Sequence, residues 1–70
     1  MEIQKHLSIT GVSEVSWKDA IIKAVSEASK SIDYLKSVKV VNQYADITGN
    51  KITLYYADLD ISFTIDNARK

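Results

Sequence analysis

Few side chains in this chain of 70 residues can bind a metal ion or move a proton. It contains no cysteine and a single histidine, His6, which falls on the polar phase of an N-terminal strand. One histidine without cysteines cannot fill the tetrahedral nitrogen and sulfur site that zinc prefers. No motif around His6 combines a nucleophile, a base and an orienting group, so we expect a protein that is not an enzyme.

The carboxylates near the C-terminus have a more suggestive spacing. Asp58, Asp60 and Asp66 share one phase of a predicted strand, which puts Asp58 and Asp60 side by side on one face. Carboxylate oxygens in this arrangement suit Ca²⁺ or Mg²⁺, although further ligands would have to come from symmetry-related copies. The alternative interpretation is a solvated strand face without a metal ion.

The four tyrosines are candidates for contacts with a partner or a ligand. Tyr56 lies on the polar face of its predicted strand, next to Tyr55 on the other face. A tyrosine there can anchor an interface between subunits or serve as a platform on which a small planar ligand stacks. We favour the interface, and we interpret Trp17, at the start of a helical stripe, as a packing residue.

The residues around the two glycines indicate which elements position these side chains. Before Gly11, Ile3, Leu7 and Ile9 alternate with polar residues and predict a strand with one wet face. After Gly11 the period becomes helical, and Ser13 or Ser16 can cap the start of the helix. The helical stripe consists of Trp17, Ala20, Ile21, Ala24, Val25, Ala28, Ile32 and Leu35.

Two further strands follow the helix. The alternation from Val38 to Ile47 slips by one residue, and a β-bulge near Val40 and Val41 would reconcile the two phases. Thr48–Lys51 then predicts a tight hairpin turn, because Gly-Asn supplies positive φ angles. The clearest strand comes last, with Tyr55, Ala57, Leu59, Ile61, Phe63 and Ile65 on its inward face.

These elements predict a single α+β domain over residues 1–70, with the order β-α-β-β. Such a small domain buries only about 60% of the surface that its unfolded chain exposes, and it has no cysteines for disulfides. One helix cannot cover both faces of a bent sheet, so we expect copies of the chain to cover the rest. Ile22, off the main stripe, is a candidate for such a contact.

The charge balance excludes some partners. Nine Lys and Arg offset nine Asp and Glu, which provides no field to attract nucleic acid or an anionic membrane. The first residues contain no apolar run like that of a signal peptide, and no stretch is long enough to span a bilayer. We therefore expect a cytoplasmic protein without a nucleic-acid or membrane partner.

The segment Thr10–Ala20, with the sequence TGVSEVSWKDA, resembles the strand-to-helix segment of dodecins. The similarity continues through Ala24–Val25, Ala28–Ile32, Val38–Gln43 and Leu59–Phe63. This resemblance implies a three-stranded antiparallel sheet wrapped around one long helix. It also implies a hollow homododecamer.

The resemblance further implies a ligand, because many dodecins hold riboflavin or related flavins such as FMN between subunits. A tryptophan at the start of the second strand stacks on the flavin and a glutamine on the third strand holds it, and these positions correspond to Ser37 and Tyr56. Since Ser37 cannot stack, the chain is closer to members that lack this tryptophan, some of which bind calcium. The resemblance therefore implies a shell that binds a small ligand or ion; the alternative is a flavin site rebuilt around Ser37 and Tyr56.

Overall fold

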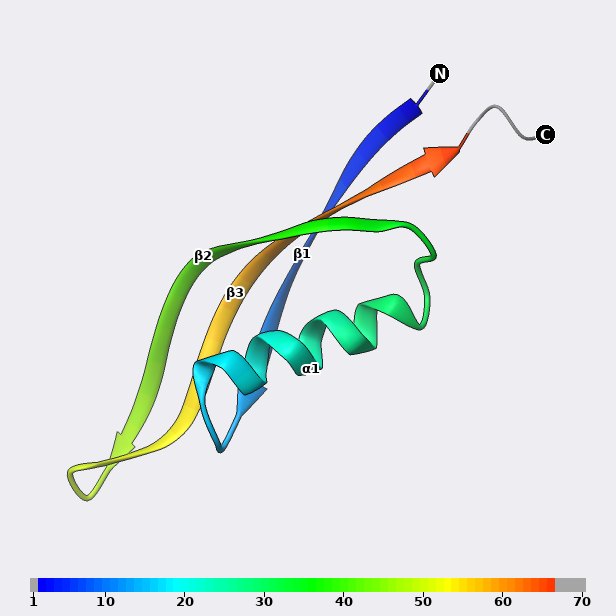
Figure 1. Ribbon diagram of the computed structural model, residues 1–70. Coiled ribbons are helices and arrows are strands. Elements are labelled where there is room, and N and C mark those ends of the chain that lie inside the picture. Colours follow the sequence, from blue (N-terminus) through cyan, green and yellow to red (C-terminus); the bar gives the residue numbers. More distant parts are fainter. Residues whose placement is uncertain (1, 67–70) are drawn as a thin grey trace.

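The computed structural model of the chain describes residues 2–66, and the side chains of residues 3–64 (Figure 1). Strand β1 (Glu2–Ser13) leads into helix α1 (Trp17–Ser29), which is followed by β2 (Leu35–Thr48) and β3 (Lys51–Asp66). The three strands form an antiparallel sheet in the order β1-β3-β2. This confirms the predicted β-α-β-β fold, with α1 covering one face of the bent sheet.

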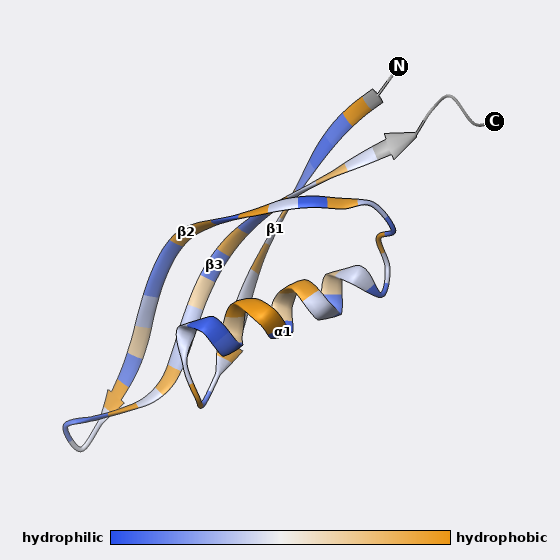
Figure 2. Ribbon diagram, in the orientation of Figure 1, coloured by the Kyte–Doolittle hydropathy of each residue, from blue (hydrophilic) through white to orange (hydrophobic). Residues whose placement is uncertain are grey.

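The hydrophobic core lies between α1 and the middle of β3. Its buried apolar residues are alanines on the helix, and an alanine and two larger residues on the strand: Ala20, Ala24, Ala28, Ala57, Leu59 and Ile61. Figure 2 shows hydrophobic and hydrophilic residues alternating along the strands, as a sheet with one covered face requires. We call the sheet face turned away from α1 the outer face; Asp58, Asp60 and Tyr56 lie on it.

Gly11 has a different role from the expected boundary between strand and helix. It lies inside β1 opposite Ala57, and the strand continues to Ser13. A Cβ atom at this position would collide with the backbone carbonyl oxygen of Ala20 and lie 3.1 Å from the Ala24 Cβ. A residue without a side chain is therefore required where α1 crosses β1 most closely.

Of the two predicted caps, Ser16 is the N-cap of α1, whereas Ser13 bonds to the turn before the helix and to the Asp19 side chain. The Ser16 side chain accepts a hydrogen bond from the Asp19 backbone N–H at 3.0 Å. The Ser13 hydroxyl donates to the Asp19 carboxylate at 2.6 Å and accepts from the Val15 N–H at 2.9 Å. The hydrogen bond from Ser13 is the main cause of a lowered pKa at Asp19, and the contact with Lys23 lowers this pKa further.

The helix is shorter than its apolar stripe predicted. It ends at Ser29, and the N–H groups of Ser31 and Ile32 both donate to the Ala28 carbonyl, which closes the last turn. The expectation that Leu35 continues the helical stripe is wrong, because Leu35 begins β2 opposite Phe63. Leu35 still packs against the core, but from the sheet.

The bulge and the hairpin turn are confirmed. The pairing of β2 with β3 shifts between Val40 and Asn42, and two further shifts occur at Leu35–Ser37 and Asp46–Ile47. Gly49 and Asn50 have φ angles of 59° and 65°, as a turn with two positive φ angles requires. The third shift lies near the turn, where Ile47 is 68% exposed.

The contact at Gly11 predicts a large effect of a small substitution. We expect Gly11→Ala to lower the free energy of unfolding by about 1–3 kcal/mol, because the added methyl group forces α1 away from β1. Urea unfolding at fixed protein concentration measures the effect. Ser8→Ala, at an exposed position of the same strand, should change this free energy by less than about 0.5 kcal/mol. Equal stabilities of the two variants would contradict the close approach.

Candidate functional site

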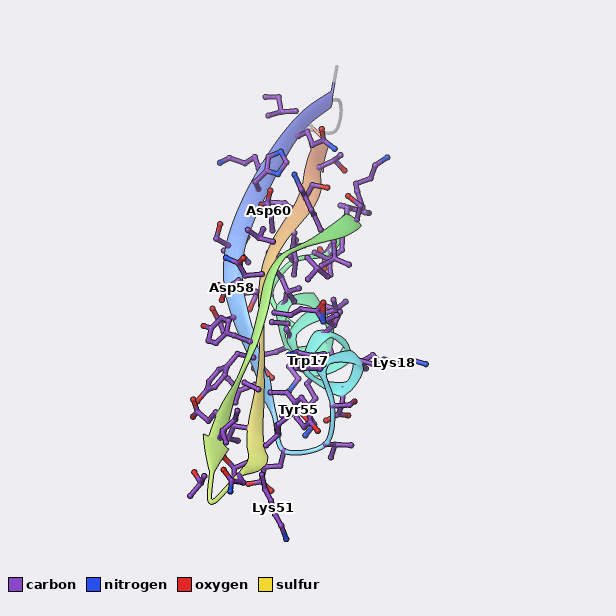
Figure 3. The ribbon with its side chains drawn as sticks, turned by 90° about the vertical axis from the view of Figure 1, so that its left-hand side faces the viewer. Trp17, Lys18, Lys51, Tyr55, Asp58 and Asp60 are labelled. Atoms are coloured by element: carbon purple, nitrogen blue, oxygen red, sulfur yellow. The ribbon has the colours of Figure 1, made fainter. Side chains whose placement is uncertain are left out.

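The candidate metal-binding carboxylates project from the middle of β3 onto the outer face. Figure 3 shows Asp58 and Asp60 on the side of the sheet opposite Trp17 and Tyr55, which lie toward α1. Both carboxylates are partly exposed. The predicted side-by-side placement of Asp58 and Asp60 is therefore present. The side chain of Asp66, the third member of the predicted row, lies outside the described residues.

Asp60 faces the only histidine of the chain. Its Oδ2 lies 3.4 Å from the His6 Nδ1, across the β1–β3 pair. The two side chains are 32% and 58% exposed, so water screens the pair and it adds little to stability. Lys39 is opposite Asp60 on the other neighbouring strand. Asp60 thus lies between two basic side chains of the outer face.

Asp58 belongs to a separate hydrogen-bonded group. Its Oδ1 accepts from the Thr10 hydroxyl at 2.8 Å and from the Tyr44 hydroxyl at 3.4 Å. These donors come from β1 and β2, the two strands that flank β3. The carboxylate therefore ties all three strands together on the outer face. Sequence reasoning did not identify this group, because its members are brought together only by the strand order.

The Tyr56 side chain packs against Tyr44 rather than standing free. The two rings are stacked, with centroids 4.9 Å apart and planes 14° from parallel. The Tyr56 hydroxyl donates to the Asp46 carboxylate at 2.7 Å. This hydrogen bond raises the pKa of Tyr56, and burial raises it further. For Tyr44, burial is the main cause of a raised pKa, and the negative charge of Asp58 adds to it.

The structure separates the two positions that correspond to the flavin site. Ser37 lies opposite Ser62, six residues along β3 from Tyr56, which corresponds to about 20 Å of strand. One copy therefore does not bring them together. The Ser37 hydroxyl is 2.7 Å from the hydroxyl of Ser62, which is buried. Ser37 thus satisfies a buried polar group.

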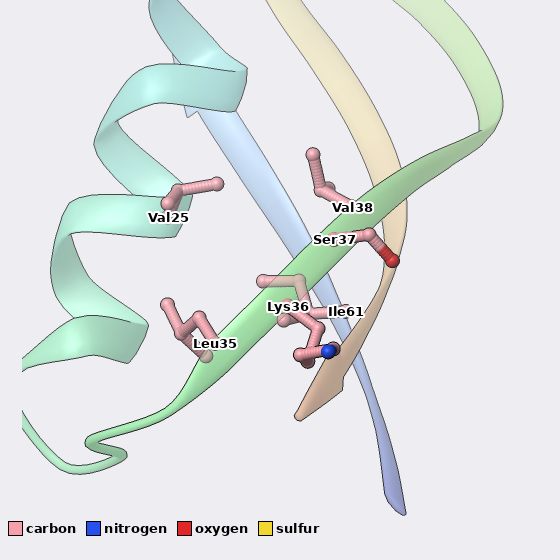
Figure 4. A pocket seen from close by; sticks show the side chains of 6 residues that line it. All are labelled: Val25, Leu35, Lys36, Ser37, Val38 and Ile61. Atoms are coloured by element: carbon pink, nitrogen blue, oxygen red, sulfur yellow. The ribbon is translucent and has the colours of Figure 1, made fainter. Parts of the chain in front are cut away.

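A hollow of about 260 Å³ lies next to Ser37, between α1 and the start of β2 (Figure 4). We call it the β2 hollow. Its residues are mostly apolar and come from three elements: Val25, Leu35, Lys36, Ser37, Val38 and Ile61. It exists because α1 packs chiefly on β1 and β3, which leaves the helix-facing side of β2 partly uncovered.

Trp17 is confirmed as a packing residue. Its indole Nε1–H donates to the Tyr44 backbone carbonyl at 3.0 Å, and its ring meets Tyr55 edge-on, with centroids 4.9 Å apart. These contacts fasten the first turn of α1 to β2 and β3. The tryptophan therefore packs the helix against the sheet.

The comparison with known proteins identifies the family. A family model described as Dodecin matches residues 3–66, which is most of the chain. The chain belongs to the dodecin family. It is 33% identical to the calcium dodecin of Mycobacterium tuberculosis over 70 residues, which cover 99% of this chain and 97% of that relative. The resemblance predicted from the sequence motifs is thus confirmed over almost the whole length.

Solved dodecin structures share the fold. A mutant of the T. thermophilus dodecin superposes with a TM-score of 0.90 at 22% identity, covering 96% of this chain and 100% of that one. The Streptomyces davaonensis dodecin gives 0.88 at 20% identity, with 94% and 97% covered. The crystal structure of the calcium dodecin gives 0.81 at 26% identity, with 97% of each chain covered, and its description includes a novel calcium-binding site.

Within residues 2–66, this dodecin has no cluster of three or more metal-ligating side chains. Asp58 and Asp60 alone supply fewer oxygens than the six to eight that Ca²⁺ takes. A calcium ion held by these carboxylates would therefore need further oxygen ligands, from water, backbone carbonyls or a second copy. In the same part of the chain, α1 is too short and too polar to cross a membrane.

The hydrogen bond between Tyr56 and Asp46 predicts how the Tyr56 hydroxyl titrates when Asp46 is replaced. We expect Asp46→Asn to lower the pKa of the Tyr56 hydroxyl toward 10.0, because the carboxylate that favours the protonated phenol loses its charge. Absorbance at the wavelength of the phenolate band, recorded as pH rises, measures the change. Asp33→Asn removes a charge outside this group and should leave the curve unaltered. Identical curves for both variants would contradict the Asp46–Tyr56 contact.

Proposed function

We propose that this dodecin is a non-catalytic subunit of a hollow homo-oligomeric shell, with sites for a small ligand or an ion completed between copies. The observation that carries the proposal is the imbalance between its small core and its exposed apolar surface. Among the side chains of residues 3–64, six apolar residues are buried. Eleven large hydrophobic side chains in the same range are substantially exposed, among them Val15, Ile22 and Ile47, which are 69%, 55% and 68% exposed.

The exposed residues are spread over several sides of the subunit. Val15 precedes α1, Ile22 lies on the helix face turned from the sheet, and Val41 is at the β2 bulge. β1 and β2 are also edge strands, each with one row of backbone groups that the described sheet does not pair. A closed assembly buries apolar surface and covers such edges at several contacts at once.

The arrangement around His6 supports a role without catalysis. Asp60 contacts His6, and Ser62 lies directly opposite His6 in the β1–β3 register. A serine, a histidine and an aspartate therefore occur close together. However, the buried Ser62 hydroxyl is hydrogen-bonded to Ser37, and a nucleophilic serine would instead have to contact the imidazole.

Calcium is the ion we propose, with Asp58 and Asp60 as ligands contributed by each copy. The family includes a calcium dodecin that matches this chain over almost its full length. Two partly exposed carboxylates on the outer face offer hard oxygen ligands that a second copy can complete. A rebuilt flavin site between Ser37 of one copy and Tyr56 of another is the alternative.

The proposed assembly predicts the mass in solution. Light scattering should give about twelve times the chain mass of 7.8 kDa. Ile22→Asp should lower this mass, because a carboxylate buried at a subunit contact is unfavourable. Lys18→Asp, a control change elsewhere on α1, should leave it unaltered. A stable monomer for the unsubstituted protein would defeat the proposal.

Ligand titrations separate calcium from flavin. We expect Ca²⁺ to bind to the assembled protein, and Asp60→Asn to weaken binding by about tenfold or more because one charged oxygen ligand is lost. Asp33→Asn is the matched control and should leave the Ca²⁺ affinity unchanged. An unchanged calorimetric isotherm for Asp60→Asn would show that this carboxylate is not a Ca²⁺ ligand. Quenching of added riboflavin fluorescence at micromolar protein would instead favour the flavin site.

A further inference from the structure

The β2 hollow has the composition of a binding site for a small amphipathic anion. We propose that it binds a molecule with a short hydrocarbon tail and a carboxylate or similar anionic group. The tail would contact Val25, Val38 and Ile61, while the anion would pair with the Lys36 ammonium group. This proposal adds a ligand class to the binding role proposed above, but the hollow is formed within one copy.

The first register shift of β2 adds Lys36 to the lining of the hollow. Leu35 pairs with Phe63 and Ser37 with Ser62, so Lys36 is an extra residue on the β2 side of the ladder. A bulge of this kind changes the direction of the side chains next to it. Consequently Leu35 and Val38 both line the hollow, together with Lys36 between them (Figure 4). An apolar wall and a cation are thus placed at one opening.

The charge at this opening is not neutralised within the described part of the chain. The ion pairs found there are His6–Asp60, Lys23–Asp19 and Lys30–Glu27, and none involves Lys36. The lining of the β2 hollow contains no carboxylate. A ligand that combines an apolar body with a negative charge therefore complements it better than a neutral or cationic one does.

Two other hollows of the subunit have a different character. The one on the outer face contains the Asp58 carboxylate beside Ser8 and Thr10, and its charge favours a cation. A third, near Ser13, contains both Glu14 and Lys23, and Lys23 is paired with Asp19. Of these three, only the β2 hollow joins an apolar lining to a cation without a nearby carboxylate.

The size of the hollow limits the ligand. Its volume of about 260 Å³ is below the range of roughly 300–1,000 Å³ that accommodates drug-sized molecules. It is also open at the surface where Val38 is 39% exposed, so part of a longer tail can extend beyond it. An unbranched ten-carbon chain is therefore a suitable probe.

Calorimetric titration of the full-length protein with decanoate tests the proposal. We expect saturable binding that Lys36→Glu weakens by about tenfold or more, because an attractive charge is replaced by a repulsive one. Lys39→Glu makes the same change three residues away, opposite Asp60 on the outer face, and should alter the affinity by less than about twofold. Decylammonium, with the same tail and the opposite charge, should bind more weakly than decanoate.

Several results would overturn the proposal. The first is an absence of saturable decanoate binding. The second is an equal loss of decanoate affinity in Lys36→Glu and Lys39→Glu, and the third is an affinity for decylammonium equal to that for decanoate. If Val38→Asp lowers the assembly mass and decanoate does not bind the unsubstituted protein, a second copy occupies the hollow instead. Light scattering on the same samples keeps the two proposals separate, since a monomer that binds decanoate would defeat only the shell.

Discussion

The close approach of α1 to β1 at Gly11 is the constraint on which the rest of the subunit depends. A glycine on the strand lets the Ala20 backbone lie against the sheet, and Ala24 and Ala28 continue the same contact along the helix. Small residues bury little apolar area themselves, but they bring the helix axis near the sheet, where Leu59 and Ile61 of β3 fill the remaining space. Ser13 and Ser16 then hold the first turn of the helix in place.

This placement determines what remains uncovered. Because α1 packs on β1 and β3, the helix-facing side of β2 is left with Val38 and Val40 each 39% exposed. The outer face has no covering layer from the described elements, and it carries the carboxylates and the Tyr44–Tyr56 stack. Which surfaces remain open to ligands and to other copies therefore depends on the close contact between α1 and β1 that Gly11 and Ala20 allow.

Local patterns were sufficient to predict most of the fold. The slip between Val40 and Val41 located a bulge, and Gly49-Asn50 located the turn, because each feature leaves a mark within a few residues. The end of α1 was not predictable in this way, since Ile32 and Leu35 keep helical spacing although they lie beyond Ser29. Leu35 packs on the same core from a strand, and hydrophobic spacing alone cannot distinguish these two arrangements.

The candidate site was less predictable because it depends on pairing between distant segments. The alternation placed Asp58, Asp60 and Tyr56 on one face, but their partners Thr10, His6 and Tyr44 are determined by the strand order and register. Ser37 shows the same limit, since its hydrogen bond to the buried Ser62 appears only once β2 and β3 are aligned. That bond gives the serine a structural role at the position that the sequence resemblance aligns with a stacking tryptophan. An indole there would leave the Ser62 hydroxyl without this partner, so residue 37 is part of the packing between β2 and β3.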